Sequence, residues 1–192
     1  MNNNPSPAHL VFSADLGFLH GNTKKYKRDA LIIKNNDFGS CTPTFHLLSS
    51  LAFELFPKVL LGYKVCLKYK DDSSVTEDII REEISNELKK YNHNIDKLYL
   101  NFPELISFLD IKKISSFNNG FVWEYRIELN KGNKHIAIKD IEAVRYGSFA
   151  KKRDIMTWCV TDDILIDLLN KIEKYVLLKE REVNEELKKF FN

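Results

Sequence analysis

The sequence predicts a mainly α-helical bundle with a small antiparallel β-hairpin packed on it. Two long stretches, residues 42–63 and 164–176, place apolar side chains at the three- and four-residue intervals of a helix face. Residues 121–129 instead alternate apolar and polar side chains with the two-residue period of a strand. Helical periods dominate the chain, and the strand-like pattern is confined to its later part.

The length and composition suit a single domain with its own core. The chain has 192 residues, of which 44% are hydrophobic. We expect residues 1–7 to be a disordered tail and residues 8–192 to be one domain. The net charge of +2 lacks the excess of a basic nucleic-acid binder, so it favours no class of partner. Two local basic clusters, residues 23–28 and 151–153, are interpreted as solvated surface.

The cysteines and the termini bear on compartment and cofactors. Cys41, Cys66 and Cys159 are widely spaced and form no Cys-x-x-Cys pair, which gives no support for a zinc or redox site. We expect buried free thiols in a reducing compartment. No signal-peptide core and no apolar run of roughly 18 residues is present. We therefore expect a soluble, cytoplasmic protein without membrane contact, cofactor or metal.

The first part of the chain contains the strongest helix. We expect a helix over residues 8–20, while residues 26–34 fit a helix or a strand. Thr42 and Pro43 suit the start of the helix over residues 42–63, which is apolar on most sides and therefore central. Pro57 removes the hydrogen bond to the Phe53 carbonyl, so a kink is expected there.

A second group of helices follows. The capping-box pattern Ser74-x-x-Glu77 predicts that the next helix spans residues 75–91, with a narrow apolar stripe typical of a surface helix. Residues 95–109 continue with helical spacing, and Pro103 marks a joint or a fresh first turn. The hairpin is expected at about residues 121–139, with a turn at residues 130–133.

The last segment is expected to be a long helix. Residues 161–163 provide its cap, and Leu165, Leu168 and Ile172 belong to its core face. Glu185 and Lys189 have the i, i+4 spacing of a surface ion pair.

Three side chains stand out as candidates for function. Glu54 and Lys58 lie one turn apart on an otherwise apolar helix, and a buried charge is costly unless it is paired. An ion pair is therefore predicted, and the alternative is that both line a pocket. His93 can cap a helix, bond a carbonyl or act as an acid or base near neutral pH. A structural role is the more common one for a lone histidine.

The apolar helix of residues 45–61 with its Glu54/Lys58 pair, followed by His-x-x-Asp-x-Leu at residues 93–98, resembles the HEPN superfamily of small helical bundles. The resemblance covers residues 42–110 and extends more loosely to Arg145-Tyr146, which is similar to an Arg-Tyr pair in this region of some HEPN-like proteins. The chain departs from the family pattern at Pro57, where a non-proline residue is usual, and at Asn94, where the family has aspartate.

The resemblance implies a ribonuclease only where an Arg-x(4–6)-His motif is present. No arginine of this chain has a histidine at that spacing; Arg126 and His135 come nearest, and they fall across the expected hairpin. The first hypothesis is therefore a non-catalytic HEPN-like protein in a stress or defence system.

The resemblance implies binding of RNA, a nucleotide or a protein partner, and a homodimer is among the partners considered. The candidate binding residues are Glu54, Lys58, His93, Arg145 and Tyr146. Two alternatives stay open: a divergent metal-independent ribonuclease that uses His93 and Arg145 as catalytic residues, and a protein-interaction scaffold. An RNA-cleaving enzyme would need those two side chains exposed in one pocket.

Overall fold

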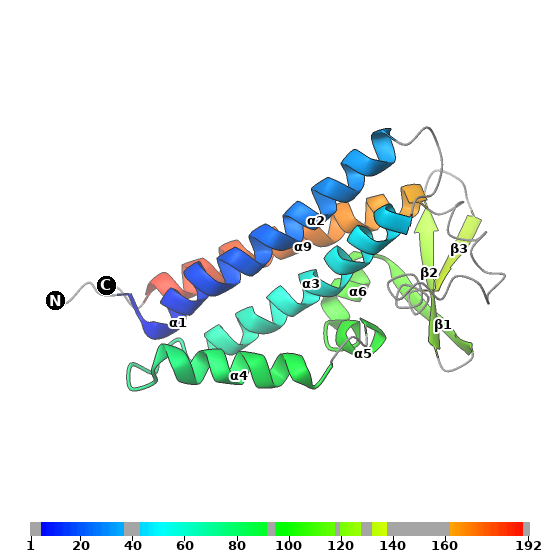
Figure 1. Cartoon of the computed structure of the whole chain (residues 1–192). Helices are drawn as coiled ribbons and strands as arrows, with labels where there is room; N and C mark the ends of the chain where they lie inside the picture. Colours follow the sequence, from blue (N-terminus) through cyan, green and yellow to red (C-terminus); the bar gives the residue numbers. More distant parts are fainter. Residues whose placement is uncertain are drawn as a thin grey trace.

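The structure, a computed structural model, describes residues 5–36, 43–91, 95–117, 120–127, 132–137 and 162–189. Most of it is a bundle of long helices (Figure 1). None of the helices in these ranges combines the length and apolarity needed to cross a membrane. The elements of the bundle are α1 (Pro7–Val11), the π-helix η1 (Phe12–Leu16), α2 (Gly17–Asn36), α3 (Pro43–Lys68), α4 (Glu77–Lys89) and α9 (Asp162–Lys188).

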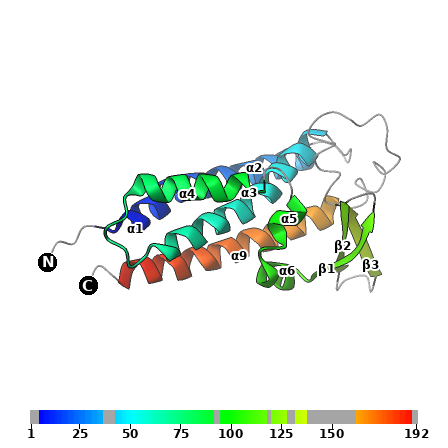
Figure 2. The same cartoon turned by 90° about the horizontal axis from the view of Figure 1, so that it is seen from below.

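Helix α3 is the centre of the bundle. Helices α2, α4 and α9 all pack on it, and Figure 2 shows it between α4 and α9. Phe53, Phe56 and Val59 are fully buried in it. Because a helix covered on several sides must be apolar on several sides, the sequence pattern predicted this position, and the prediction is confirmed.

The first helical stretch is longer than its pattern suggested. Helices α1, η1 and α2 follow one another without a gap, so residues 26–34 are helical rather than strand. The Ser6 side chain caps α1 by accepting a hydrogen bond from His9 N at 3.2 Å. Residues 1–4 of the expected tail lie outside the described residues. The π-helix directs Phe12 and Leu16 into the core.

The contact between η1 and α3 depends on Gly62. A Cβ at Gly62 would overlap the buried Leu16 side chain, lying 2.9 Å from its Cδ1 and nearer still to Cδ2. We expect Gly62→Ala to destabilise the protein, because overpacking of about 1–3 kcal/mol exceeds the gain in helix propensity of about 1 kcal/mol.

The matched control is Gly17→Ala, since Gly17 is also helical but has nothing within 4 Å of a built Cβ. This variant is expected to gain about 0.5–1 kcal/mol. Chemical denaturation of both variants checks the pair, and equal effects at the two glycines would contradict the packing described.

Helix α3 continues through Pro57, and another helix supplies the missing hydrogen bond. Pro57 has no N–H to offer to the Phe53 carbonyl. The hydroxyl of Tyr99, on α5 (Ile95–Tyr99), donates to that carbonyl at 2.9 Å, with both groups buried. The expected kink stays a prediction, and the capping role of Thr42 lies outside the described residues.

The start of α4 differs from the expected capping box. The helix begins at Glu77 with Thr76 as its N-cap, and no side chain caps it. Ser74 instead turns back to Asp72, whose carboxylate accepts from the Ser74 hydroxyl at 2.6 Å and from its backbone N–H at 3.0 Å. An Asx turn competes successfully with the capping box here. In α4, Ile80 and Ile84 are buried, and the other residues are exposed or half-buried. The predicted position of α4 on the surface is therefore confirmed.

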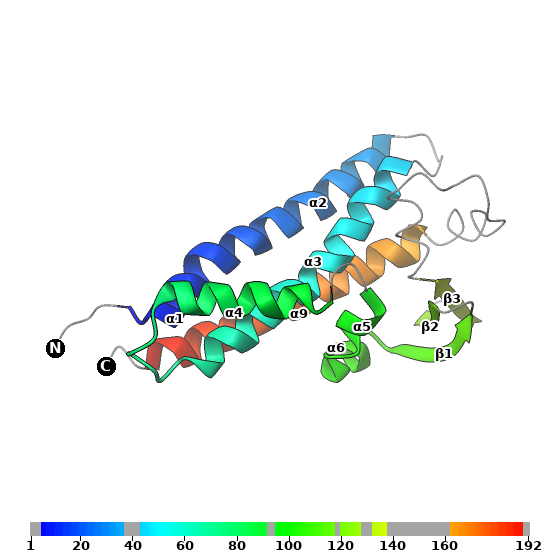
Figure 3. The ribbon, with the colours of Figure 1, turned by 60° about the horizontal axis from the view of Figure 1, so that its bottom comes forward.

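The prediction of a β-hairpin packed on the bundle is wrong. The described strands form a three-stranded antiparallel sheet in the order β1-β2-β3. The sheet lies at the end of the bundle away from the termini, as Figures 1 and 3 show. In the described part of the chain its main contact with a helix joins β1 to α6, the element just before it. The elements are α6 (Pro103–Phe108), β1 (Ile111–Phe117), β2 (Gly120–Ile127) and β3 (Gly132–Ala137).

Strand β1 was not predicted from the sequence, for a physical reason. The apolar residues of β1 are Ile111, Ile114 and Phe117, a spacing of three that does not alternate. The pairing with β2 shifts register between Lys113 and Ser115. Such a bulge inserts a residue and breaks the two-residue period by which a strand is predicted.

Helix α9 forms the third long side of the bundle. Leu165, Leu168 and Ile172 are buried, which confirms its predicted core face. The predicted Glu185–Lys189 pair is wrong, because Lys189 binds Glu186, one residue closer along the helix. Both spacings place the partners on neighbouring positions of the helix surface.

Candidate functional site

Two of the five predicted binding residues lie in the described part of the chain. Lys58 Nζ is 2.5 Å from Glu54 Oε1, and the Glu54 residue is only 3% exposed. The predicted ion pair is therefore confirmed. His93, Arg145 and Tyr146 lie outside the described residues. The structure brings Glu54 and Lys58 together, while the shared site of all five residues stays a prediction.

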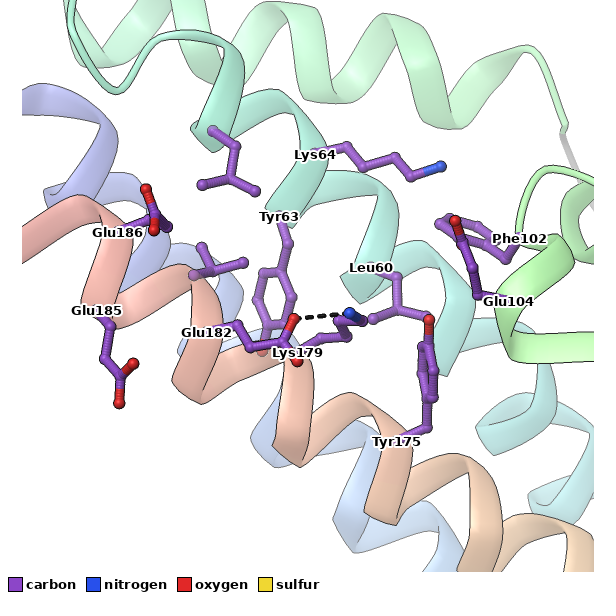
Figure 4. Close-up of a pocket in the computed structure, with 12 residues that line it drawn as sticks. Leu60, Tyr63, Lys64, Phe102, Glu104, Tyr175, Lys179, Glu182, Glu185 and Glu186 are labelled. Carbon is purple, nitrogen blue, oxygen red and sulfur yellow. Dashed lines mark hydrogen bonds and ion pairs between the residues drawn. The ribbon is translucent and has the colours of Figure 1, made fainter. Parts of the chain in front are cut away.

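The structure contains a groove that the sequence analysis did not find. It lies between α3 and α9, is bordered by α6 and the residue before it, and has a volume of about 520 Å³ (Figure 4). We call it the α3–α9 groove. Its lining combines apolar, aromatic and charged side chains, namely Leu60, Tyr63, Lys64, Leu67, Phe102, Glu104, Tyr175, Lys179, Glu182, Val183, Glu185 and Glu186.

The floor of the groove is apolar and well packed. Leu60, Tyr63 and Val183 are each less than 5% exposed, so they form a firm base rather than a loose surface. Tyr175 forms part of the lining, and its ring packs on Phe108 with centroids 5.2 Å apart. Phe108 is 40% exposed, so the apolar surface continues beyond the groove.

The rim of the groove is acidic. Two lysines and four glutamates line it, which gives a net charge of −2. Lys179 binds Glu182 at 2.6 Å, and this hydrogen bond raises the pKa of Lys179. Neither Glu104 nor Glu185 has an ion pair with a described cation.

Lys64, the other cation of the lining, forms no ion pair with these carboxylates in the described structure. It donates to the Asn101 carbonyl at 3.1 Å and lies 4.4 Å from the centre of the Phe102 ring. Glu186 is bound by Lys70 and Lys189, which lie outside the lining. The groove therefore keeps two carboxylates, Glu104 and Glu185, without an ion pair among the described residues.

A second set of polar residues lies between α2 and α9, and two of them, His20 and Lys27, are buried. Lys27 forms an ion pair with Glu173, and His20 Nδ1 lies 3.4 Å from a Glu180 carboxylate oxygen. His20 and Lys27 are two helical turns apart on α2, as are Glu173 and Glu180 on α9. The antiparallel helices thus match basic groups on one side with acidic groups on the other. We call these four residues the polar seam.

The polar seam makes stability depend on pH. Burial lowers the pKa of His20; Glu180 opposes this effect, and Lys24 adds to it. Because the folded pKa is depressed below the ordinary value of about 6.5, the unfolded chain binds the proton more readily. The free energy of unfolding should therefore fall as pH falls below about 6.5, towards the folded pKa.

The comparison of wild type with His20→Gln checks this expectation. In that variant, the part of the pH dependence between pH 7 and 5 that belongs to His20 should disappear. Thermal or urea unfolding across this range gives the measurement. An identical pH dependence in the two proteins would show that His20 is not held neutral by burial.

The described residues offer little for other chemistries. No group of three or more His, Cys, Asp or Glu among them is placed to hold a metal ion. Burial raises the pKa of Cys66 to about 12, so its thiol is a structural one. Cys41 and Cys159 lie outside the described residues.

Comparison of the chain with protein-family models, with curated proteins and with solved structures found no match. The HEPN resemblance accordingly stays a prediction. The α3–α9 groove is the feature of the structure from which function is inferred.

Proposed function

We infer that this protein is a non-catalytic binding protein whose α3–α9 groove receives a helix of a partner protein. The observation that carries this proposal is an apolar floor beside Glu104 and Glu185, two carboxylates that form no ion pair with a cation of the described structure. A helix with apolar side chains on one face and lysine or arginine beside them satisfies both features. The HEPN resemblance implies binding of RNA, a nucleotide or a protein, and this proposal selects the protein.

The dimensions of the groove suit a short helix. Its lining runs from Tyr175 to Glu186 on α9, which corresponds to about 17 Å at the α-helical rise per residue. A partner helix of about three turns spans that length and places apolar side chains at positions i, i+4 and i+7 on the floor. The volume of about 520 Å³ accommodates several such side chains.

Charge disfavours a nucleic acid in this groove. RNA binding depends largely on cations that neutralise phosphates. Here a phosphate would meet Glu104 and Glu185, while Lys179 is already bound to Glu182. The ribonuclease alternative depends on His93 and Arg145, which lie outside the described residues, so no observation favours it over the groove.

Fluorescence anisotropy with a synthetic peptide tests the proposal. The peptide is a labelled amphipathic helix with leucine at the contacting positions and lysine beside them. We expect saturable binding to the wild type that weakens several-fold in Glu104→Lys and again in Glu185→Lys. Neither change breaks an ion pair that the structure shows.

The matched control is Glu82→Lys, which reverses an exposed charge on α4 outside the groove. This variant should bind the peptide as the wild type does. Absence of binding, or equal weakening by all three substitutions, would contradict the proposal.

A further inference from the structure

Helix α2 carries an exposed stripe along its outer side. Counting from Phe18, the exposed residues follow at intervals of three and four, the period of one helix face. Phe18 is 73% exposed and Ile32 is 50% exposed, which are high values for large apolar side chains. Figures 1 and 3 both show α2 at the edge of the bundle. We call this set the α2 stripe: Phe18, Gly21, Lys25, Arg28 and Ile32.

The α2 stripe is basic as well as apolar. Lys25 and Arg28 are exposed between its two apolar ends. Arg28 pairs with the adjacent Asp29 at 3.5 Å on the surface, which is a weak pairing. The opposite face of the same helix holds His20, Thr23 and Lys27 in the core. In the described part of the chain these side chains are exposed, so the stripe can take part in a contact with another molecule.

The α2 stripe matches the α3–α9 groove in charge and length. Its two cations complement Glu104 and Glu185, the two groove carboxylates without an ion pair in the described structure. From Phe18 to Ile32 the helix extends about 21 Å, compared with about 17 Å for the groove along α9. Gly21 lies inside the stripe with nothing within 4 Å of a built Cβ, so a facing helix can approach closely there.

We propose that the α2 stripe of one copy docks in the α3–α9 groove of a second copy. The proposal rests on the proposed function, since it names the partner helix of that same groove. The two surfaces are different, so each contact is head-to-tail rather than symmetric. A contact of this kind continues into a chain of copies or closes into a ring.

The apolar ends of the stripe favour a protein surface over RNA. Phe18 and Ile32 gain by leaving water for an apolar floor, whereas a phosphate backbone offers them no such contact. At the groove, Leu60 and Val183 supply that floor, and Glu185 supplies the charge for Lys25 or Arg28. The same surface that repels RNA therefore suits α2.

Sedimentation velocity of paired variants tests the docking. Phe18→Glu replaces an apolar end of the stripe with a charge and leaves the groove unchanged. Glu104→Lys/Glu185→Lys reverses the charge of the groove and leaves the stripe unchanged. All three positions are exposed, so both proteins should fold as the wild type does. The wild type should associate increasingly with concentration, whereas each variant alone should stay monomeric.

The mixture of the two variants gives the sharpest result. It contains one usable stripe and one usable groove, so it should form a single 1:1 dimer that grows no further. Ser13→Glu, an exposed change on η1 off the stripe, should associate as the wild type does. A mixture that stays monomeric, or variants that associate as the wild type does, would overturn the proposal.

A separate outcome distinguishes failure of this proposal from failure of the proposed function. If the wild type is monomeric at every concentration but binds the synthetic peptide in its groove, self-docking is refuted and the binding function stands. If the wild type is monomeric and a labelled RNA oligonucleotide binds it but not Phe18→Glu, the stripe is an RNA surface and self-docking is again refuted.

Discussion

Replacing Lys27 with methionine is expected to lower the free energy of unfolding by about 3 kcal/mol, at the lower end of the range for a broken buried ion pair. Lys27 is 9% exposed and forms its ion pair with Glu173 of α9. Methionine keeps an unbranched apolar stem, one atom shorter than that of lysine, but leaves the carboxylate without its cation. Because the Glu173 side chain is 22% exposed, some solvent remains to offset the loss.

The matched control is Lys90→Met on α4. Lys90 binds Glu87, and the Lys90 side chain is 59% exposed. The same substitution should change stability little there, because exposed ion pairs contribute little. Urea denaturation followed by circular dichroism gives both values. Equal losses at the two lysines would show that the polar seam is not a buried feature of the fold.

Replacing Tyr99 with phenylalanine is expected to cost about 1–3 kcal/mol, the penalty for a buried polar group left without its partner. The Tyr99 hydroxyl donates to the Phe53 carbonyl at 2.9 Å, and Pro57 cannot supply the usual backbone donor. Phenylalanine keeps the ring, which stacks on Phe53 with centroids 5.5 Å apart. The change therefore isolates the hydroxyl.

A double-mutant cycle with Pro57→Ala checks the cause. The Pro57→Ala substitution would restore a backbone N–H that faces the Phe53 carbonyl, so Tyr99→Phe should cost less in that background. We expect a coupling free energy of at least about 0.5 kcal/mol. If Tyr99→Phe costs the same in both backgrounds, the hydroxyl does not replace the missing backbone donor.

The helical part of the fold was largely predictable. Residues 42–63 are apolar on most sides, and a helix of that kind has to be buried, as Phe53 and Phe56 are. The Glu54–Lys58 pair also followed from the sequence, because both partners lie one turn apart on the same helix. Local spacing is sufficient where the interacting groups share one element.

Features that join distant elements were not predictable in this way. The bulge in β1 hid a strand whose apolar residues recur at every third position. The α3–α9 groove combines Leu60 with Val183, residues far apart in the chain, so no local pattern contains it. The place of Lys179 and Glu182 beside an apolar floor likewise depends on the packing of α9 on α3.

A charge-swap measurement tests most directly whether the groove carboxylates select a basic helix. The affinity of a peptide with glutamate in place of its lysines is measured for the wild type and for Glu104→Lys/Glu185→Lys. We expect the double variant to bind this acidic peptide at least tenfold more tightly than the wild type does, and the preference to reverse for the basic peptide. Equal binding of each peptide by both proteins would show that the carboxylates do not select the partner.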